Sequence, residues 1–372
     1  MAEIQPIVMP KWGLAMQEGM LAAWHVAEGQ DVTKGQEIAD IETSKIANAF
    51  ESPVSGPLRR RLVGEGETVQ VGALLAVVAD KSIADDAIEA FVADFQASFA
   101  ASAAEAAADT GPEPEFVEAG GRRLRYLKVG EAGGAPVLFI HGFGGDLNNW
   151  LFNQPALAET HTTYALDLPG HGGSAKAVGS GDVGAMTAAV CDFMAAKGIA
   201  RAHLVGHSLG GAISLDLALN HPELAASVTA VAPAALGPEI SMEYIDGFMS
   251  TSRARKLKSV LEMLVCNPDL VTNEMVEDVL KYKRLDGVDA ALNQVASACF
   301  AGGHQSLELT ARLGEIKAPI RVVWGREDRI LPVSHSQGLP ASVQVTVIDG
   351  AGHLVHMEKA AEVNELIKAQ VA

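Results

Sequence analysis

The sequence predicts a multidomain chain in which a small all-β sandwich is followed by an α/β domain with a mostly parallel sheet and a helical cap. Three observations lead to this prediction. A glycine-containing pattern occurs twice near the N-terminus, a run rich in alanine and acidic residues follows it, and the rest alternates apolar strand-like runs with helix-like segments. We expect domains at 1–80 and 115–372, joined by a linker at 81–114.

The composition is that of an acidic globular protein. The 372 residues carry a formal net charge of −18, which argues against binding to nucleic acid or to an anionic membrane surface. No apolar run approaches the roughly 20 residues that a membrane span needs. The N-terminus lacks the basic and apolar regions of a signal peptide, so we expect a cytoplasmic protein. The three scattered cysteines are expected to be reduced and not to bind a metal.

The N-terminal repeat predicts two similar β-layers. Four residues recur at a constant offset of 37, namely Glu28, Gly29, Val32 and Gly35, which return as Glu65, Gly66, Val69 and Gly72. Each copy has a glycine turn, a short strand, a second glycine turn and a second strand. This pattern is typical of two β-layers facing one another. Because only two copies exist, a solenoid is excluded.

The sandwich is expected to display one lysine. Lys45 lies between "EIADIE" and "IANAFESP", two segments that alternate like antiparallel strands. We therefore expect it at a hairpin tip, exposed and held by a rigid scaffold. A lysine at a turn is usually just a solvated surface residue, so its position alone does not assign a role.

The whole N-terminal segment resembles the lipoyl domains of 2-oxoacid and acetoin dehydrogenase complexes. "MPKWGLAMQEG", "EGQDVTKGQEIADIETSKIANAFESPVSG" and "EGETVQVGALLAVV" carry the resemblance, which covers about the first 80 residues. It implies that Lys45 carries lipoic acid in amide linkage and serves as a group carrier. Biotinyl carriers share the fold, but the methionines that typically flank their lysine are missing here.

The linker is expected to be partly helical. Alanine and acidic residues dominate it, and Ile83, Ala87, Phe91, Phe95 and Phe99 recur every four residues, which predicts an amphipathic helix over part of it. The alanine-rich remainder, ending in "TGPEPE", is expected to be a polar tether. Lipoyl-bearing acyltransferases usually have a small basic partner-binding domain at this point, and this acidic segment does not resemble one.

Six apolar runs of the second domain are expected to be strands: "APVLFIHG", "TTYALDLPG", "AHLVGHS", "ASVTAVAP", "PIRVVWG" and "VQVTVID". Continuous apolar strands are typical of a parallel sheet that is covered on both faces. Residues 234–315 interrupt this pattern with helix-like segments. They are expected to form a cap over the catalytic site of this domain.

A G-x-S-x-G motif at 206–210 makes Ser208 a candidate nucleophile. It lies between an apolar strand and an Ala/Leu-rich helix, which is the context that the motif requires. Asp328 and His353 follow two later strands, at the edge where open α/β sheets gather their sites. We expect Ser208 to be the nucleophile and His353 the general base and then acid. Asp328 is expected to orient and stabilise the imidazolium.

Other residues compete for these roles. Glu327 could replace Asp328, and His356 could replace His353, although we expect His356 to start the final helix and pack there. His304 has no comparable context in "AGGHQ". Asp167, in "DLPGHGGS", is expected to fix a turn.

Two backbone N–H groups are expected to form an oxyanion hole. They belong to Phe143, in "HGFGG", and to Leu209, directly after the candidate nucleophile. Together these motifs resemble the α/β-hydrolase family over essentially all of 115–372. That resemblance implies an α/β-hydrolase-type catalytic domain.

A basic stretch stands out in the predicted cap. "SRARKLKSV" brings Arg253, Arg255, Lys256 and Lys258 together on an otherwise acidic chain. It is either a clamp for the phosphates of coenzyme A or, as charge runs usually are, a solvated helix face.

The combination of both domains resembles the family of dihydrolipoamide acetyltransferase components of acetoin-cleaving dehydrogenase complexes. The resemblance implies acetyl transfer from lipoyl-Lys45 to coenzyme A as co-substrate. It also implies two partners, a thiamine-diphosphate-dependent acetoin dehydrogenase component and a dihydrolipoamide dehydrogenase, and we expect a homo-oligomer. Two alternatives stay open at this point: a lipoyl-bearing serine hydrolase or thioesterase, and a non-enzymatic lipoyl carrier and scaffold.

Overall fold

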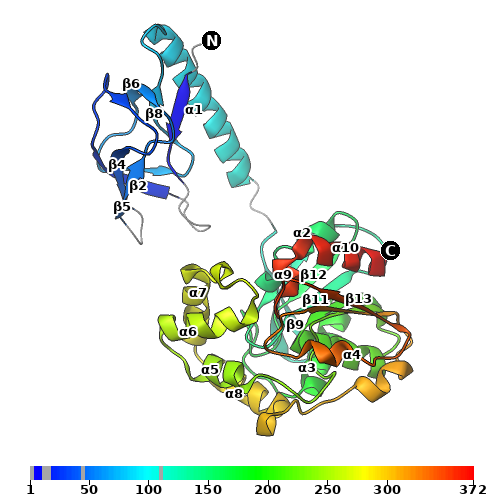
Figure 1. Cartoon of the computed structure of the whole chain (residues 1–372). Helices are drawn as coiled ribbons and strands as arrows, with labels where there is room; N and C mark the ends of the chain where they lie inside the picture. The colour runs from blue at the N-terminus through cyan, green and yellow to red at the C-terminus, as the bar shows by residue number, and fades with distance from the viewer. Residues whose placement is uncertain (1–3, 11–17, 43–46, 109–111) are drawn as a thin grey trace. The chain divides into compact units, whose positions relative to one another are not determined.

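The chain forms two compact units, Met1–Gly111 and Pro112–Ala372 (Figure 1). The computed structural model describes residues 4–10, 18–42, 47–108 and 112–372. Within these ranges, none of the helices has both the length and the apolar character needed to cross a bilayer. The same ranges contain no cluster of His, Cys, Asp and Glu side chains that could hold a metal ion.

Two four-stranded antiparallel sheets form the N-terminal unit, with the strand orders β1-β8-β6-β3 and β5-β4-β2-β7. The strands are β1 (Gln5–Val8), β2 (Glu18–Trp24), β3 (Asp31–Val32), β4 (Glu37–Glu42), β5 (Ala47–Glu51), β6 (Gly56–Arg61), β7 (Glu67–Gln70) and β8 (Leu74–Val78). Fully buried Ile7, Leu21 and Leu58 share one core that both sheets enclose. The predicted all-β sandwich is confirmed.

Each copy of the repeat contributes one strand to each sheet. β3 and β4 follow the turns at Gly29 and Gly35, and β7 and β8 follow the turns at Gly66 and Gly72. β3 and β8 belong to one sheet, whereas β4 and β7 belong to the other. The four glycines have φ between 83° and 86°, a left-handed conformation that glycine adopts without steric cost. The repeat therefore encodes the turns that move the chain between the two sheets.

Helix α1 (Asp85–Ala108) begins against the sandwich. Ile88 is fully buried and packs with Leu74 and Val77 of β8, and the partly buried Phe91 and Phe95 join this cluster. Ala87, which the four-residue spacing placed on the apolar face, is exposed instead. A strict spacing of four drifts around an α-helix, whereas Ile88, Phe91 and Phe95 follow the i, i+3, i+7 pattern of one face.

An eight-stranded sheet organises the C-terminal unit, with the order β16-β15-β14-β13-β11-β12-β10-β9. All six predicted strands are present: β11 (Val137–Ile140), β12 (Thr163–Leu166), β13 (Ala202–His207), β14 (Ala225–Val231), β15 (Ile320–Gly325) and β16 (Val343–Ile348). These strands pair with one another in parallel. The prediction of a mostly parallel sheet is confirmed.

An antiparallel edge hairpin was not among the predicted strands. It consists of β9 (Glu115–Ala119) and β10 (Arg122–Val129), and β10 also pairs antiparallel with β12. β10 has the sequence RRLRYLKV, in which the buried Leu124 and Tyr126 alternate with charged residues. A search for continuous apolar runs finds strands that are covered on both faces, so it misses a strand of this kind.

Helices cover both faces of the sheet. α3 (Val183–Ala196) and α4 (Leu209–Asn220) lie on one face, and α2 (Gln154–Ala158) and α10 (Ala360–Val371) lie on the other. Successive residues of β11 enter the two cores alternately: Val137 and Phe139 share a core with α10, whereas Leu138 and Ile140 share one with α3 and α4. A strand buried in this way must be apolar at every position.

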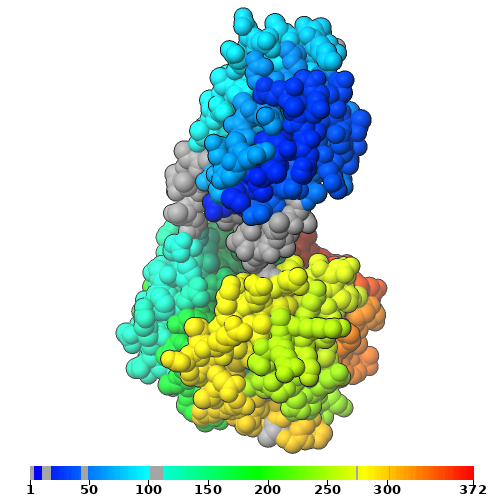
Figure 2. Space-filling model, turned by 90° about the vertical axis from the view of Figure 1, so that its left-hand side faces the viewer, coloured from blue at the N-terminus to red at the C-terminus, as the bar shows by residue number. Residues whose placement is uncertain are grey.

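Four helices between β14 and β15 form the predicted cap, which Figure 2 shows as a continuous lime-to-yellow surface. They are α5 (Met242–Ser250), α6 (Ala254–Leu261), α7 (Asn273–Lys283) and α8 (Val288–Cys299). Short 3₁₀ helices occur at Leu147–Trp150, Glu262–Leu264, Pro268–Leu270, Ala301–Gly303, Thr310–Glu315 and Val333–Ser336, and α9 spans Val355–Glu358. Lys283 of α7 donates hydrogen bonds to the carbonyl groups of Phe248 and Thr251 at the C-terminal end of α5. A cation there also favours the helix dipole, so this contact ties two cap helices together.

Replacing Ile88 with alanine tests the packing of α1. The change should lower the free energy of unfolding of the N-terminal unit by about 2–5 kcal/mol, because it leaves a cavity against β8. Hydrogen exchange of the β8 amides in urea measures this unit specifically. Glu89→Ala, at the exposed neighbouring position, is the matched control and should change little. Equal exchange in both variants would show that α1 does not stabilise the sandwich.

Candidate active site

Ser208 lies at a sharp turn between β13 and α4. Its φ of 52° and ψ of −115° are costly for a residue with a side chain. Close packing explains both glycines of the motif. A Cβ at Gly206 would lie 2.1 Å from the carbonyl oxygen of Gly210, and a Cβ at Gly210 would lie 2.1 Å from that of Ile140. The G-x-S-x-G sequence is therefore a packing requirement of this turn.

His353 and Asp328 are hydrogen-bonded partners at the carboxyl edge of the sheet, after β16 and β15. His353 Nδ1 lies 2.8 Å from Asp328 Oδ2, and the two side chains are 3% and 0% exposed. The N–H groups of Ile330 and Leu331 donate to Asp328 Oδ1 at 2.8 and 3.0 Å. This fixed carboxylate accepts the Nδ1–H of the imidazole, which leaves Nε2 without that proton and able to accept one.

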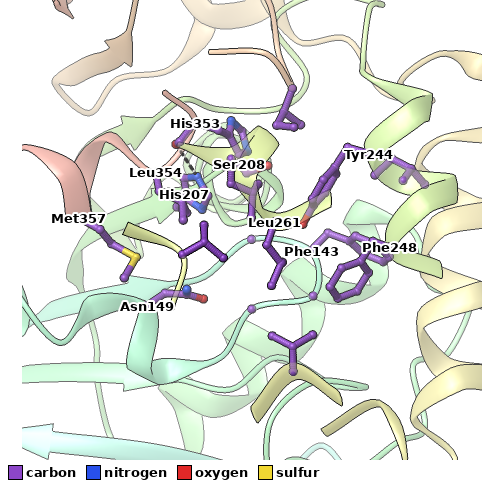
Figure 3. Close-up of a pocket in the computed structure, with 18 of the residues that line it drawn as sticks. Phe143, Asn149, His207, Ser208, Tyr244, Phe248, Leu261, His353, Leu354 and Met357 are labelled. Atoms are coloured by element: carbon purple, nitrogen blue, oxygen red, sulfur yellow. Dashed lines mark hydrogen bonds between the residues drawn. The ribbon is translucent and has the colours of Figure 1, made fainter. Parts of the chain in front are cut away.

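Ser208 and His353 line the same pocket (Figure 3). Their side chains make no direct hydrogen bond among the bonds that the structure describes. Hydrogen bonds between a nucleophile and its base are often long without substrate and shorten in the complex. The structure therefore brings together Ser208, His353 and Asp328, the three residues that the sequence suggested.

The competing residues have other partners. Glu327 accepts the N–H of Ala351 at 3.0 Å and so holds the loop that leads to His353. His304 is exposed at the cap. His356 is fully buried, with its ring 4.6 Å from the ring of Trp150, and burial lowers its pKa to about 3.

The expectation that His356 starts the final helix is wrong in detail. His356 lies in the short α9, and α10 begins only at Ala360. Lys359, between the two helices, has φ −125° and ψ 44°, which interrupts the helical conformation. His356 packs in the interior as expected, but it lies in α9 and not in the final helix α10.

The two N–H groups predicted for the oxyanion hole come from neighbouring elements. Phe143 lies on the loop after β11, and a Cβ at the preceding Gly142 would lie 3.0 Å from Ser208 Cβ, so this loop passes next to the nucleophile. Leu209 is the first residue of α4. The N–H of a first helical residue has no acceptor within its helix. Both residues therefore lie next to Ser208 in the chain or in space, and the oxyanion hole itself stays a prediction.

His141 ties this loop to the next one. Its Nδ1 donates to the carbonyl oxygen of Gly142 at 2.7 Å, and its Nε2 accepts the N–H of Leu168 at 3.0 Å. Burial lowers the pKa of His141 to about 4, so the ring is neutral and can donate from one nitrogen while accepting at the other.

Asp167 is a second anchor of the same loops. It accepts the N–H of Gly173 at 2.7 Å, which fixes the expected turn, and also that of Leu147 at 2.8 Å. Burial raises the pKa of Asp167 to about 6, and these two N–H groups and Arg125 act in the opposite direction. Asp167 thus supports the structure of the loop that carries Phe143.

An apolar pocket of about 120 Å³ lies beside Ser208 (Figure 3). Phe143, Ser208 and His353 line one side of it, and Tyr244 and Phe248 of α5 line another. Among the described residues that line it, none is Asp, Glu, Lys or Arg. The pocket suits an uncharged group attached to the carbonyl carbon that Ser208 would attack.

Two residues that support the site were not predicted from the sequence. Trp324 Nε1–H donates to Asp328 Oδ2 at 3.0 Å, the same oxygen that faces His353. His207 Nε2–H donates to the carbonyl oxygen of His353 at 3.0 Å, and burial lowers the pKa of His207 well below its usual value. Both lie within apolar strands, where a buried polar atom needs a partner. A polar residue within an apolar strand is the one signal in the sequence that could have drawn attention to Trp324 and His207.

Helix α6 presents the predicted basic stretch. Arg253, Arg255 and Lys256 are exposed, and Lys258 is half-buried. On the inner side, Leu257 and Leu261 are buried, and Leu261 lines the pocket. In the part of the chain that the structure describes, the four basic residues form no ion pair. The basic face therefore lies on the outer side of a helix whose inner side closes the pocket.

Lys45 lies outside the described residues. The strands before and after it pair antiparallel, with Glu42 of β4 opposite Ala47 of β5. The two arms of the predicted hairpin are therefore present.

Two family models match the chain. One, of the alpha/beta hydrolase fold, matches residues 135–360, and the other, of biotin-requiring enzymes and lipoyl domains, matches residues 5–78. A meta-cleavage product hydrolase from Pseudomonas fluorescens has the same fold as the C-terminal unit, with a TM-score of 0.62 and 22% identity over 68% of this chain and 95% of that chain. This likeness confirms the predicted fold of the second domain.

Curated relatives extend over both units. A dihydrolipoyllysine-residue acetyltransferase component of an acetoin cleaving system from Pseudomonas putida is 46% identical over 99% of both chains, and its counterpart from Cupriavidus necator is 43% identical over 98% of this chain and 96% of its own length. A 2-hydroxy-6-oxo-6-phenylhexa-2,4-dienoate hydrolase from Burkholderia cepacia is 30% identical over 64% of this chain and 89% of its own. The chain therefore belongs to the family of dihydrolipoyllysine-residue acetyltransferase components of acetoin cleaving systems, in which a lipoyl-type domain and an α/β hydrolase domain are fused.

Proposed function

We propose that this chain transfers an acetyl group from lipoyl-Lys45 to coenzyme A during the cleavage of acetoin. One observation carries the proposal: a lipoyl-type domain occurs in the same chain as a strained serine turn, next to a hydrogen-bonded His353–Asp328 pair. A lipoyl arm delivers acyl groups as thioesters, and a serine with such a pair accepts acyl groups. The fusion thus joins an acyl donor to an acyl acceptor.

Lys45 would hold lipoic acid through its side-chain amine. The antiparallel strands β4 and β5 on either side fit this role, because a hairpin of this kind presents its tip to a partner site. The bound group supplies a dithiol that carries acetyl as a thioester.

In the first step, Ser208 Oγ attacks the carbonyl carbon of the acetyl thioester while His353 Nε2 takes its proton. Asp328 holds the Nδ1–H of His353 and stabilises the imidazolium. The N–H groups of Phe143 and Leu209 stabilise the negative charge on the carbonyl oxygen. Loss of one such donor typically lowers the rate by about 10²–10³. Cleavage of the carbon–sulfur bond would release the thiol, and His353 would return the proton to its sulfur.

In the second step, His353 takes the proton of the coenzyme A thiol, and the sulfur attacks the acetyl group on Ser208. The ester bond breaks, and Ser208 regains its proton from His353. Positioning of the thiol favours this reaction over attack by water. The basic residues at the start of and within α6, namely Arg253, Arg255, Lys256 and the half-buried Lys258, are proposed to hold the phosphates of coenzyme A beside the pocket.

Hydrolysis is a second candidate, because the C-terminal unit has the fold of hydrolases and is 30% identical to one of them. In this case water would attack acetyl-Ser208. The acetylated protein, mixed with coenzyme A, distinguishes the two: a transferase yields acetyl-coenzyme A, and a thioesterase yields acetate regardless of coenzyme A. A non-enzymatic carrier and scaffold would yield neither.

The proposed partners follow from membership of an acetoin cleaving system. A thiamine-diphosphate-dependent acetoin dehydrogenase component would load acetyl onto the arm, and a flavoprotein dihydrolipoamide dehydrogenase would reoxidise it. A homo-oligomer and a cytoplasmic location remain predictions.

Lipoylation of Lys45 is tested by mass. Expression with lipoate and a lipoate ligase should add one lipoyl mass to the full chain, and Lys45→Gln should abolish it. Lys34→Gln, at an exposed position of the same unit, is the control and should keep the modification. A lipoyl mass that persists in Lys45→Gln would overturn the assignment.

The role of Ser208 is tested by replacing it with alanine. Acetyl transfer to coenzyme A and turnover of small activated esters should both fall by about 10³-fold or more, since removal of the nucleophile leaves only the binding groups. His353→Ala should have a similar effect, whereas Ser180→Ala, at an exposed position, should have none. Transfer to coenzyme A that survives in Ser208→Ala would favour direct, His-assisted transfer without an acyl-serine.

The basic face of α6 is tested by two pairs of substitutions. Arg255→Gln with Lys256→Gln should raise the KM for coenzyme A by about tenfold, and high salt should reduce the difference, because exposed charges are screened. Acetate release without coenzyme A should change little. Lys317→Gln with Lys368→Gln removes the same charge elsewhere on this unit and should leave the KM unchanged. If both double variants have the same KM for coenzyme A, the basic face of α6 is only a solvated surface.

A further inference from the structure

The pocket beside Ser208 is larger than its proposed acyl group needs. Acetyl places a single methyl group beyond the carbonyl carbon, whereas the pocket encloses about 120 Å³. An apolar cavity of about 150 Å³ in another protein stays dry and binds benzene. The space beside Ser208 is therefore comparable to a six-carbon group.

Most of the residues that line this pocket are apolar, and the aromatic rings among them are closely packed. Phe143 and Phe248 have ring centroids 5.9 Å apart, and Phe143 and Phe300 have theirs 5.7 Å apart, each pair meeting edge to face. The Phe248 ring is so close to the loop after β11 that a Cβ at Gly144 would lie 2.6 Å from it. The cap thus rests directly on the loop that carries Phe143, and the space that remains is a defined cavity.

The chemistry of these walls selects the kind of group that fits. Half-buried Val279 of α7 and buried Leu261 of α6 complete the cap side. A charged phosphate would lose hydrogen bonds to water here and would find no Lys or Arg among the described lining residues. A hydrocarbon group gains free energy in proportion to the area it buries.

We propose that the site also accepts acyl groups of about four to six carbons, aliphatic or aromatic, and that it turns over their activated esters faster than the acetyl ester. The inference rests on the proposed acyl-Ser208 and adds the class of acyl group that it takes. The carbonyl carbon lies at Ser208, its oxygen faces the N–H groups of Phe143 and Leu209, and the hydrocarbon extends toward Phe248 and Val279. Ser208 and His353 act on these longer thioesters or esters as they do on acetyl.

The test uses p-nitrophenyl acetate, butyrate, hexanoate and benzoate with the full chain. Because the leaving group is constant, differences in kcat/KM report the acyl side once they are divided by the rate of each ester with hydroxide. Each buried methylene should raise kcat/KM about fourfold while the pocket fills, so butyrate, with two more methylenes, should exceed acetate by about fifteenfold. If kcat/KM stays constant or falls from acetate to hexanoate, the proposal is overturned. The pocket would then bind another part of the substrate, such as the hydrocarbon chain of the thiol.

Two opposite substitutions at one position tie the preference to the pocket. Val279→Phe should lower the ratio of hexanoate to acetate by about tenfold or more, and Val279→Ala should raise it. Val345→Phe, the same change at an exposed position of β16, is the control and should leave the ratio unchanged. If neither Val279 variant changes the ratio, the pocket does not select the acyl group.

Ser208→Ala separates the two proposals. Loss of turnover for every ester, together with a flat dependence on chain length in the unaltered protein, would leave the proposed function in place and overturn only this inference. Ester turnover that survives in Ser208→Ala would overturn the acyl-serine itself.

Discussion

The geometry of the site depends on how the turn at Ser208 is held. Its conformation costs on the order of 1–3 kcal/mol and persists only where the surroundings determine it. Here the Ser208 N–H donates to Val231 O at 3.0 Å, and its carbonyl oxygen accepts the N–H of Ala234 at 3.0 Å. The turn is therefore fixed to the end of β14. Gly210 lies so close to the end of β11 that a Cβ there would lie 2.1 Å from the carbonyl oxygen of Ile140, so the turn has little room to move toward β11.

Neutral histidines connect the loops around this turn. The ring of His207 lies 4.6 Å from that of His353 and 4.5 Å from that of His356. Burial lowers the pKa of both His207 and His356, so neither carries a positive charge at neutral pH. This matters because His353 becomes positively charged during each step of the proposed mechanism. Charged neighbours at these distances would oppose that charge, whereas neutral rings pack against His353 without this cost.

Much of the fold could be predicted because apolar patterning and glycine placement are local signals. The six parallel strands and the turns at Gly29 and Gly66 follow from them. Strand β10, next to the edge strand β9, could not be found in this way, because the charged Arg125 separates its buried Leu124 and Tyr126. Ser208, Asp328 and His353 were found from motif order and strand ends. The residues that support them were not predicted. Trp324 reaches Asp328 only through the twist and register of β15, which the sequence does not display.

The cap bears on the choice of acceptor as much as on the acyl group. A triad of this kind passes an acyl group to whichever nucleophile reaches it, so the triad alone does not distinguish a transferase from a hydrolase. A water molecule needs two to four polar partners to occupy a cavity, and the walls formed by Phe248 and Phe300 offer none. An acyl group that fills this space would shield its ester from that side. A thiol held by groups outside the pocket could then approach from the remaining side with a large advantage in effective concentration. In the proposed mechanism, the cap would favour transfer to a thiol, and Ser208, His353 and Asp328 would supply the acyl chemistry.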